Sequence, residues 1–196
     1  MVHAHHGVGK YEGMVKRSIG GVERDYLLIA YKGGDKLYVP VSQLHLGGGT
    51  PTFLSDEELS DLMHMVRRHF NLVAGGEYSV EVDPRTVTRE RLEVLHRLGF
   101  NRLSFGVQDF DPAVQKAVHR VQPAEQVFAL VAAARRIGFE SVNVDLIYGL
   151  PLQTVASFDV TLSKIIALRP DRIAAYSYAH LPELVRAQRL IRREDM

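Results

Sequence analysis

The stretch LHLGGGTPT, residues 44–52, decides the fold, because an apolar strand runs directly into a glycine turn. The succession of strand, loop and helix then repeats towards the C-terminus. Further strands are predicted in EYSVEVD (77–83), NRLSFGVQ (101–108), ESVNVDLIYG (140–149) and RIAAYSYAH (172–180). Five strands that alternate with helices predict an α/β fold with a parallel sheet and right-handed crossovers. We expect a barrel-like sheet covered on both faces, with a flat doubly wound sheet as second possibility.

Polar caps and apolar spacing mark the helices between these strands. Ser55 and Glu58 form a capping box ahead of an apolar stripe. Further helices are expected at 88–98, from about Pro123 to Gly138, from about Ser157 to Leu168 and from about Glu183. The segments RLGFNRLSF (97–105) and RIGFESVNV (136–144) share an Arg-apolar-Gly-Phe step, in which glycine fits a helix end. This echo favours successive βα units.

Residues 1–43 follow a different pattern, in which glycines separate short β-prone runs. The pairs Gly20-Gly21 and Gly33-Gly34 stand where hairpin turns would reverse the chain. The sequence therefore predicts two parts. A small antiparallel β module occupies residues 1–43, and a partial β/α barrel occupies residues 44–196.

The composition favours a globular protein and excludes several kinds of chemistry. The formal net charge of the 196 residues is +1, so no overall field directs the chain to nucleic acid or a membrane. No run approaches the roughly 18 apolar residues of a membrane span, and we expect a cytoplasmic location. The chain has no cysteine, and thus no disulfide, thiolate nucleophile or thiolate-held iron–sulfur cluster.

Polar residues gather at the carboxyl ends of the predicted strands, where parallel β/α folds place their ligand sites. They are the glycines 47–49 with Thr50, then Glu81, Asp83, Gln108, Asp109, Asp145, Tyr178 and His180. If the strands are neighbours, these groups converge on one rim. Each also has a plainer interpretation: the glycines could form a tight turn, the carboxylates could cap helices, and Arg120 could face solvent. His3, His5 and His6 could form a weak metal-binding tract or be solvated.

From about Gln43 onward the chain resembles oxygen-independent coproporphyrinogen III oxidase, a radical S-adenosylmethionine (SAM) oxidoreductase of porphyrin and haem biosynthesis. The matching runs are QLHLGGGTPTFL, EVDP, GFNRLSFGVQDF, NVDLIYGLPLQT and RPDRIAAYSYAHLP. This resemblance implies a partial β/α barrel and a porphyrinogen substrate. It also implies a [4Fe–4S] cluster, two SAM molecules, and radical decarboxylation of propionates to vinyls.

The resemblance also implies roles for individual residues. Gly48 and Glu81 would contact the SAM bound at the cluster. The second SAM would be contacted by Gly49, Thr50, Gln108, Arg120, Asp145 and Ala179. Glycine amides and an arginine suit a carboxylate, whereas the two acidic side chains suit an ammonium group or ribose hydroxyls.

The chain lacks the part of this family that binds the iron–sulfur cluster. The family's first βα unit, whose CxxxCxxC loop holds the cluster, has no counterpart here. We therefore expect no metal ligand, no catalytic residue and no activity from this chain alone. A second chain could supply the missing unit.

Residues 1–46 resemble a different family, the CarD-like RNA-polymerase-interacting module of the transcription-repair coupling factor. The matching runs are VHAHHGVGKYEGM and GGVERDYLLIAYKGGDKLYVPVSQLHL. That module is a small Tudor- or SH3-like barrel, and its partner would be the β subunit of RNA polymerase. Both families carry something close to VSQLHL at the junction. We interpret the chain as a chimera, either recombined, misassembled or artificially generated, and alternatively as a polymerase-binding module on a passive scaffold.

Overall fold

The computed structural model describes residues 2–3, 7–19, 22–31, 36–40, 42–48, 50–70, 72–183, 186–191 and 195. The chain divides into two compact units. The first contains residues 1–45 and 57–78, and the second contains residues 46–56 and 79–196. No helix in the described ranges is long and apolar enough to cross a membrane.

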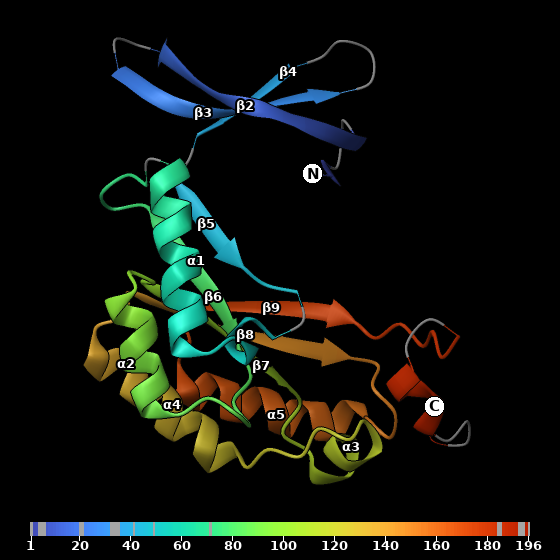
Figure 1. Cartoon of the computed structure of the whole chain (residues 1–196). Helices are drawn as coiled ribbons and strands as arrows, with labels where there is room; N and C mark the ends of the chain where they lie inside the picture. The colour runs from blue at the N-terminus through green and yellow to red at the C-terminus, as the bar shows by residue number, and fades with distance from the viewer. Residues whose placement is uncertain are drawn as a thin grey trace. The chain divides into compact units, whose positions relative to one another are not determined.

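The first unit contains an antiparallel sheet, as the glycine-punctuated sequence predicts. Its order is β1-β2-β3-β4, with β1 at Val2–His3, β2 at Gly7–Ile19, β3 at Val22–Tyr31 and β4 at Lys36–Pro40 (Figure 1). The β2–β3 register shifts between Tyr11 and Gly13, where the glycine has a φ of 133°. The predicted Gly20-Gly21 and Gly33-Gly34 turns, and His5 and His6, lie outside the described residues. Helix α1 (Asp56–His69) buries Leu59 and Met63 of its apolar stripe.

The second sheet has the order β5-β6-β7-β8-β9. Its strands are β5 (Gln43–Leu46), β6 (Glu77–Val82), β7 (Arg102–Gln108), β8 (Ser141–Tyr148) and β9 (Arg172–Ser177). The pairs β6–β7, β7–β8 and β8–β9 are parallel. This is an open, curled half-barrel, so the barrel-like arrangement is confirmed in preference to a flat doubly wound sheet.

Local signals in the sequence explain where the helices begin and end. They are α2 (Arg89–Arg97), α3 (Pro112–Ala117), α4 (Ala124–Ile137) and α5 (Val155–Leu168). The Asp111 carboxylate caps α3 by accepting from the amides of Ala113 and Val114. Gly99 and Gly138 end α2 and α4 with φ values of 93° and 112°, which confirms the repeated Gly-Phe step. Pro51–Phe53 and Arg186–Leu190 form short 3-10 helices.

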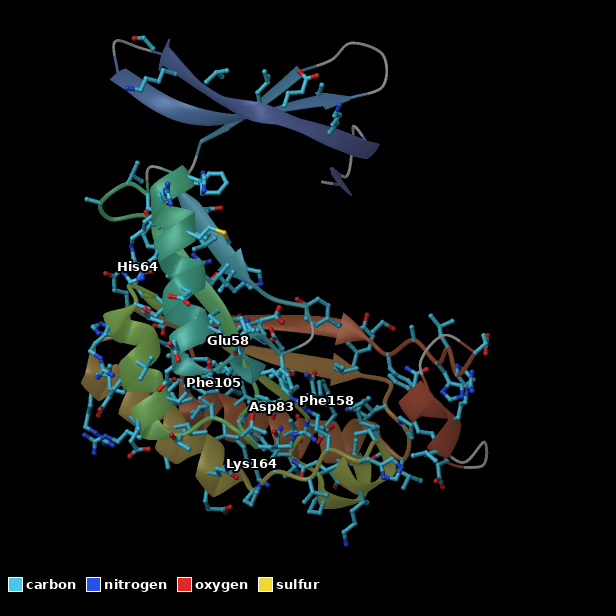
Figure 2. The ribbon with its side chains drawn as sticks, viewed as in Figure 1. Glu58, His64, Asp83, Phe105, Phe158 and Lys164 are labelled. Carbon is cyan, nitrogen blue, oxygen red and sulfur yellow. The ribbon has the colours of Figure 1, made fainter. Side chains whose placement is uncertain are left out.

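The two faces of β6–β8 differ in polarity because side chains alternate along a strand. In β6–β8 one face is apolar and almost fully buried, and includes Val80, Leu103, Phe105, Val144 and Leu146. Phe105 of this face is labelled in Figure 2. Helices α2, α4 and α5 lie along one side of these strands in Figure 1. The opposite face carries polar side chains, among them Ser104, Asn143 and Asp145, and a cavity opens on it, so the two faces are not packed alike. That polar face carries the candidate site.

Two helix predictions need correction. Helix α5 begins at Val155 rather than Ser157, because Thr154 and Ser157 form a reciprocal capping box. The helix expected from about Glu183 is also wrong, since the described part of that segment contains only the 3-10 turn Arg186–Leu190. The side chain of Gln188 in this turn bonds the backbone of Ala179 and Leu181, which precede the segment.

Candidate functional site

A cavity of about 300 Å³ opens on the polar face at the carboxyl ends of β6, β7 and β8. We call it the groove. Its polar lining is Thr50, Glu81, Asp83, Gln108, Arg120 and Asp145, and its other lining residues are Val82, Gly106, Ile147 and Tyr176. Five of the predicted site residues therefore meet in one place: Thr50, Glu81, Gln108, Arg120 and Asp145.

The carboxylates of the groove are held by neighbouring groups on the same face. Glu81 accepts a hydrogen bond at 3.0 Å from the amide of Gly48, whose φ of 79° favours glycine. Asp145 accepts bonds of 2.8 Å from Ser104 and 2.8 Å from Asn143. The glycine turn thus fixes one acidic side chain, and the strand neighbours fix the other.

Arg120 supplies the positive charge of the groove. Its Nη2 donates to the carbonyl oxygen of Gly106 at 2.9 Å and lies 3.5 Å from the carboxylate of Asp83. Its buried Nε has no hydrogen-bond partner among the described residues. Burial lowers the pKa of this guanidinium, and the carboxylate of Asp83 opposes that shift. A guanidinium that lines the cavity is suited to an anionic ligand group.

Asp83 is held ionised by a second arginine. Arg85 donates to its two oxygens from Nε at 3.0 and 3.1 Å and from Nη2 at 2.6 Å. Burial raises the pKa of Asp83, but the hydrogen bonds from Arg85 and the charge of Arg120 outweigh it and leave the pKa below its usual value. The groove therefore combines fixed negative and positive charges.

A smaller cavity of about 220 Å³ shares Gln108, Arg120 and Ile147 with the groove. It is more apolar, since Val118, Leu150, Tyr178 and Ile191 complete most of its lining. The hydroxyl of Tyr178 lies 3.2 Å from Nδ1 of His180. These two predicted rim residues thus belong beside the groove rather than in its polar lining.

The remaining predicted residues are placed differently. Gly49 lies outside the described residues. Ala179 is absent from the groove lining, and its carbonyl oxygen accepts a bond from Gln188 at 2.9 Å. Asp109 does not face the groove: it is 1% exposed and bonds the hydroxyl of Thr161. Sequence reasoning missed four lining residues, Val82, Gly106, Ile147 and Tyr176. The period of two along the strand from Asp145 could have indicated Ile147, which pairs with Tyr176 of β9.

Comparisons with known proteins agree with this architecture. Residues 32–165 match the model of the radical SAM superfamily. The chain belongs to that superfamily. Residues 1–46 separately match the model of the CarD-like/TRCF RID domain.

Individual relatives show which members of the superfamily this chain is similar to. The chain is 51% identical over 158 residues to oxygen-independent coproporphyrinogen III oxidase from Pseudomonas aeruginosa, and 52% identical over 156 residues to that from Escherichia coli. The solved coproporphyrinogen III oxidase of Escherichia coli, a radical SAM enzyme, superposes with a TM-score of 0.75 over 79% of this chain. An archaeal Elp3 at 15% identity, with a TM-score of 0.65 over 81% of this chain and 42% of its own, shares the fold. This chain spans about 34% of the curated relatives' length and 36% of the solved enzyme.

The superfamily uses SAM and a [4Fe–4S] cluster, and the two fit this chain differently. Iron–sulfur clusters are held by cysteine thiolates, and the 196 residues contain no cysteine, so the residues present do not fit the cluster. SAM presents a carboxylate, an ammonium group, a sulfonium and ribose hydroxyls. Arg120 offers a positive charge to the carboxylate of SAM, and Glu81 and Asp145 offer carboxylates to its ammonium group or ribose hydroxyls, so the groove fits SAM.

Proposed function

We propose that residues 44–196 form the SAM-binding core of an oxygen-independent coproporphyrinogen III oxidase. The proposed whole-enzyme activity is the SAM-dependent radical decarboxylation of porphyrinogen propionates to vinyls in haem biosynthesis. The observation that carries the proposal is the meeting of Arg120, Gln108 and three carboxylates on the polar face of a half-barrel. Identity of about one half to this enzyme, over four fifths of the chain, supports the choice within the superfamily. The cytoplasm remains the predicted location.

The proposal assigns parts of SAM to parts of the groove. Gly48 and Glu81 contact the SAM that the relatives hold at their cluster. Gly49, Thr50, Gln108, Arg120, Asp145 and Ala179 contact a second molecule. The guanidinium of Arg120 suits the carboxylate of SAM, and Asp145 suits its ribose or ammonium group. Each assignment extends by charge and geometry what the resemblance implies.

Ligand-detected NMR tests the binding part of this proposal. Saturation transfer to SAM is expected with the unmodified chain and is expected to be lost with Asp145→Ala. Asp159→Ala is the matched control, because Asp159 is exposed on α5 away from the groove. Equal saturation transfer with and without the Asp145 side chain would contradict the assignment.

The proposed activity requires a cluster that this chain does not hold by itself. After anaerobic reconstitution with iron and sulfide, we expect no release of carbon dioxide from coproporphyrinogen III, because no thiolate is present to bind iron. Restoration of turnover by a separate polypeptide that carries the CxxxCxxC unit would support the enzyme-core proposal. Turnover by the purified chain alone would refute the expected inactivity.

A second candidate function concerns the N-terminal module. We propose that residues 1–43 bind the β subunit of RNA polymerase, and the match of residues 1–46 to the CarD-like/TRCF RID model supports this. A pull-down of purified RNA polymerase tests it. Leu28→Asp in β3 is expected to abolish retention of the polymerase, whereas Lys10→Glu on β2, a strand neighbour of Ala30, is the control. Equal retention by both variants and the unmodified chain would count against docking through YLLIAY.

A further inference from the structure

The backbone turns sharply where β7 delivers Gln108 into the groove. Gln108 has a φ of 66°, and the amide of Asp109 donates to the carbonyl oxygen of Val107 at 2.8 Å. A hydrogen bond between residues two apart across a central residue with positive φ defines a γ-turn of the rare, strained kind. The β7–β8 register shifts at the same point, between Gly106 and Gln108. Such strain persists only where the surroundings hold it in place.

Two buried glutamine side chains hold the backbone at both ends of this turn. Nε2 of Gln122 donates to the carbonyl oxygen of Val107, and Nε2 of Gln115 donates to that of Asp109 at 2.8 Å. Gln115 is 5% exposed and Gln122 is 2% exposed. Both bonds are therefore shielded from competition with water.

The side chain of Asp109 holds the turn in place by accepting three hydrogen bonds. It accepts from the amide of Asp111 at 2.6 Å, the hydroxyl of Thr161 at 2.7 Å and Nε2 of Gln153 at 2.5 Å. Thr161 is 1% exposed, and its oxygen also accepts from the amide of Phe110 at 3.1 Å. We call the side chains of Asp109, Gln115, Gln122, Gln153 and Thr161 the clamp.

The same clamp holds the loop that carries Arg120. Oε1 of Gln115 accepts from the amide of Gln122 at 3.0 Å, and its Nε2 donates to the carbonyl oxygen of Gln122 at 2.9 Å. The amide of Arg120 donates to the carbonyl oxygen of Gln115 at 2.8 Å. Gln108 and Arg120, which both line the groove, are thus tied to one buried network.

We propose that the clamp residues are positioning residues that hold Gln108 in its strained turn and so preorganise the groove. The claim about ligand affinity rests on the proposed SAM function, whereas the claim about strain does not. Preorganisation raises affinity because the binding groups need not be ordered when the ligand arrives. If the clamp were only structural, its removal would lower the stability of the chain by the same amount whether residue 108 is Gln or Gly.

A double-mutant cycle of melting temperatures, the thermal cycle, tests the strain without any ligand. Glycine adopts positive φ without steric cost, so Gln108→Gly is expected to raise the Tm of the full chain by about 2 °C or more. In a Thr161→Val background the clamp is loosened, and the same substitution should give a smaller rise. Arg169→Gly is the control, because Arg169 has a φ of 53° at the end of α5 and should shift the Tm equally in both backgrounds. No rise in the Tm for Gln108→Gly, or an equal rise in both backgrounds, would contradict the proposal that the clamp holds Gln108 in a strained turn.

A binding cycle tests the consequence for the groove. Calorimetry with SAM is expected to show a Kd at least about fivefold weaker for Thr161→Val, but no further loss when Thr161→Val is added to Gln108→Gly. Equal losses in both backgrounds would contradict a role through Gln108. If the unmodified chain binds no SAM, the proposed function fails while the thermal cycle still decides the clamp. If Thr161→Val does not fold, Gln153→Leu removes a different hydrogen bond to the same Asp109 carboxylate and replaces Thr161→Val in both cycles.

Discussion

Gly106 allows Gln108 and Arg120 to lie across the surface of β7, so an added methyl group there should disturb the groove. A Cβ built on Gly106 would stand 3.0 Å from Nη2 of Arg120 and 3.1 Å from Nε2 of Gln108. Both distances are shorter than ordinary carbon–nitrogen contacts, so these two groups must move by a few tenths of an ångström. Because both are ends of flexible side chains, we expect the Gly106→Ala chain to fold with a Tm within about 2 °C of the original.

The same displacement should weaken ligand binding strongly. Arg120 is fixed by its 2.9 Å bond to the carbonyl oxygen of Gly106, and its shift would misalign the guanidinium. A hydrogen bond to a charged group contributes about 1.5–3 kcal/mol, so losing one to the carboxylate of SAM raises the Kd about 10- to 100-fold. Isothermal calorimetry with SAM measures this change, and thermal melts of the same samples show whether the fold is retained.

Two comparisons isolate the cause. Ser163→Ala, on the exposed side of α5, changes a residue of similar size away from the groove and should leave the Kd unchanged. In an Arg120→Ala background, Gly106→Ala should have little further effect, because the group that it displaces is gone. Unchanged affinity for Gly106→Ala, or an equal loss in both backgrounds, would refute the reasoning.

Three further predictions concern stability. Asp83 has a lowered pKa in the fold, so its contribution to stability is present above its unfolded pKa and is lost as pH falls through the folded pKa. Melts at decreasing pH should show Asp83→Asn less stable than the original at neutral pH, with a difference that shrinks in acid; a difference that does not change with pH would contradict the assignment. Thr154→Ala removes the capping box of α5 and should lower the Tm by about 2–4 °C, whereas an unchanged Tm would argue against the cap. Phe105→Ala empties a fully buried position and should cost about 3–5 kcal/mol in urea unfolding, with a cost below about 1 kcal/mol contradicting the core assignment.

Local signals made most of the β/α architecture predictable. Asp111 before Pro112, and glycine after the last turns of α2 and α4, mark helix ends through interactions within a few residues. The convergence of Glu81, Gln108 and Asp145 was also predictable, because carboxyl ends of neighbouring parallel strands meet at one edge. The boundary between residues 43 and 44 stays a prediction.

Features that depend on distant contacts could not be read from the sequence. Asp109 follows Gln108 and looked like a second rim residue, but it is turned inward by Thr161, 52 positions further along the chain. Similarly, the helices cover only one set of the alternating side chains of the sheet, and the other set forms the polar face. The hydrophobicity of the strands alone did not reveal which set is covered. In the described part of the segment after Glu183, Leu190 is 69% exposed and the backbone forms a 3-10 turn, so the sequence was an insufficient guide to a helix there.

Calorimetric titration of the folded chain with SAM, beside a Gln108→Ala, Asp145→Ala variant, tests the central claim most directly. Our account predicts saturable binding by the unmodified chain and its loss in the variant, since both side chains line the groove. Absence of binding by a chain shown to be folded, or equal binding by both proteins, would contradict the assignment of the groove to SAM.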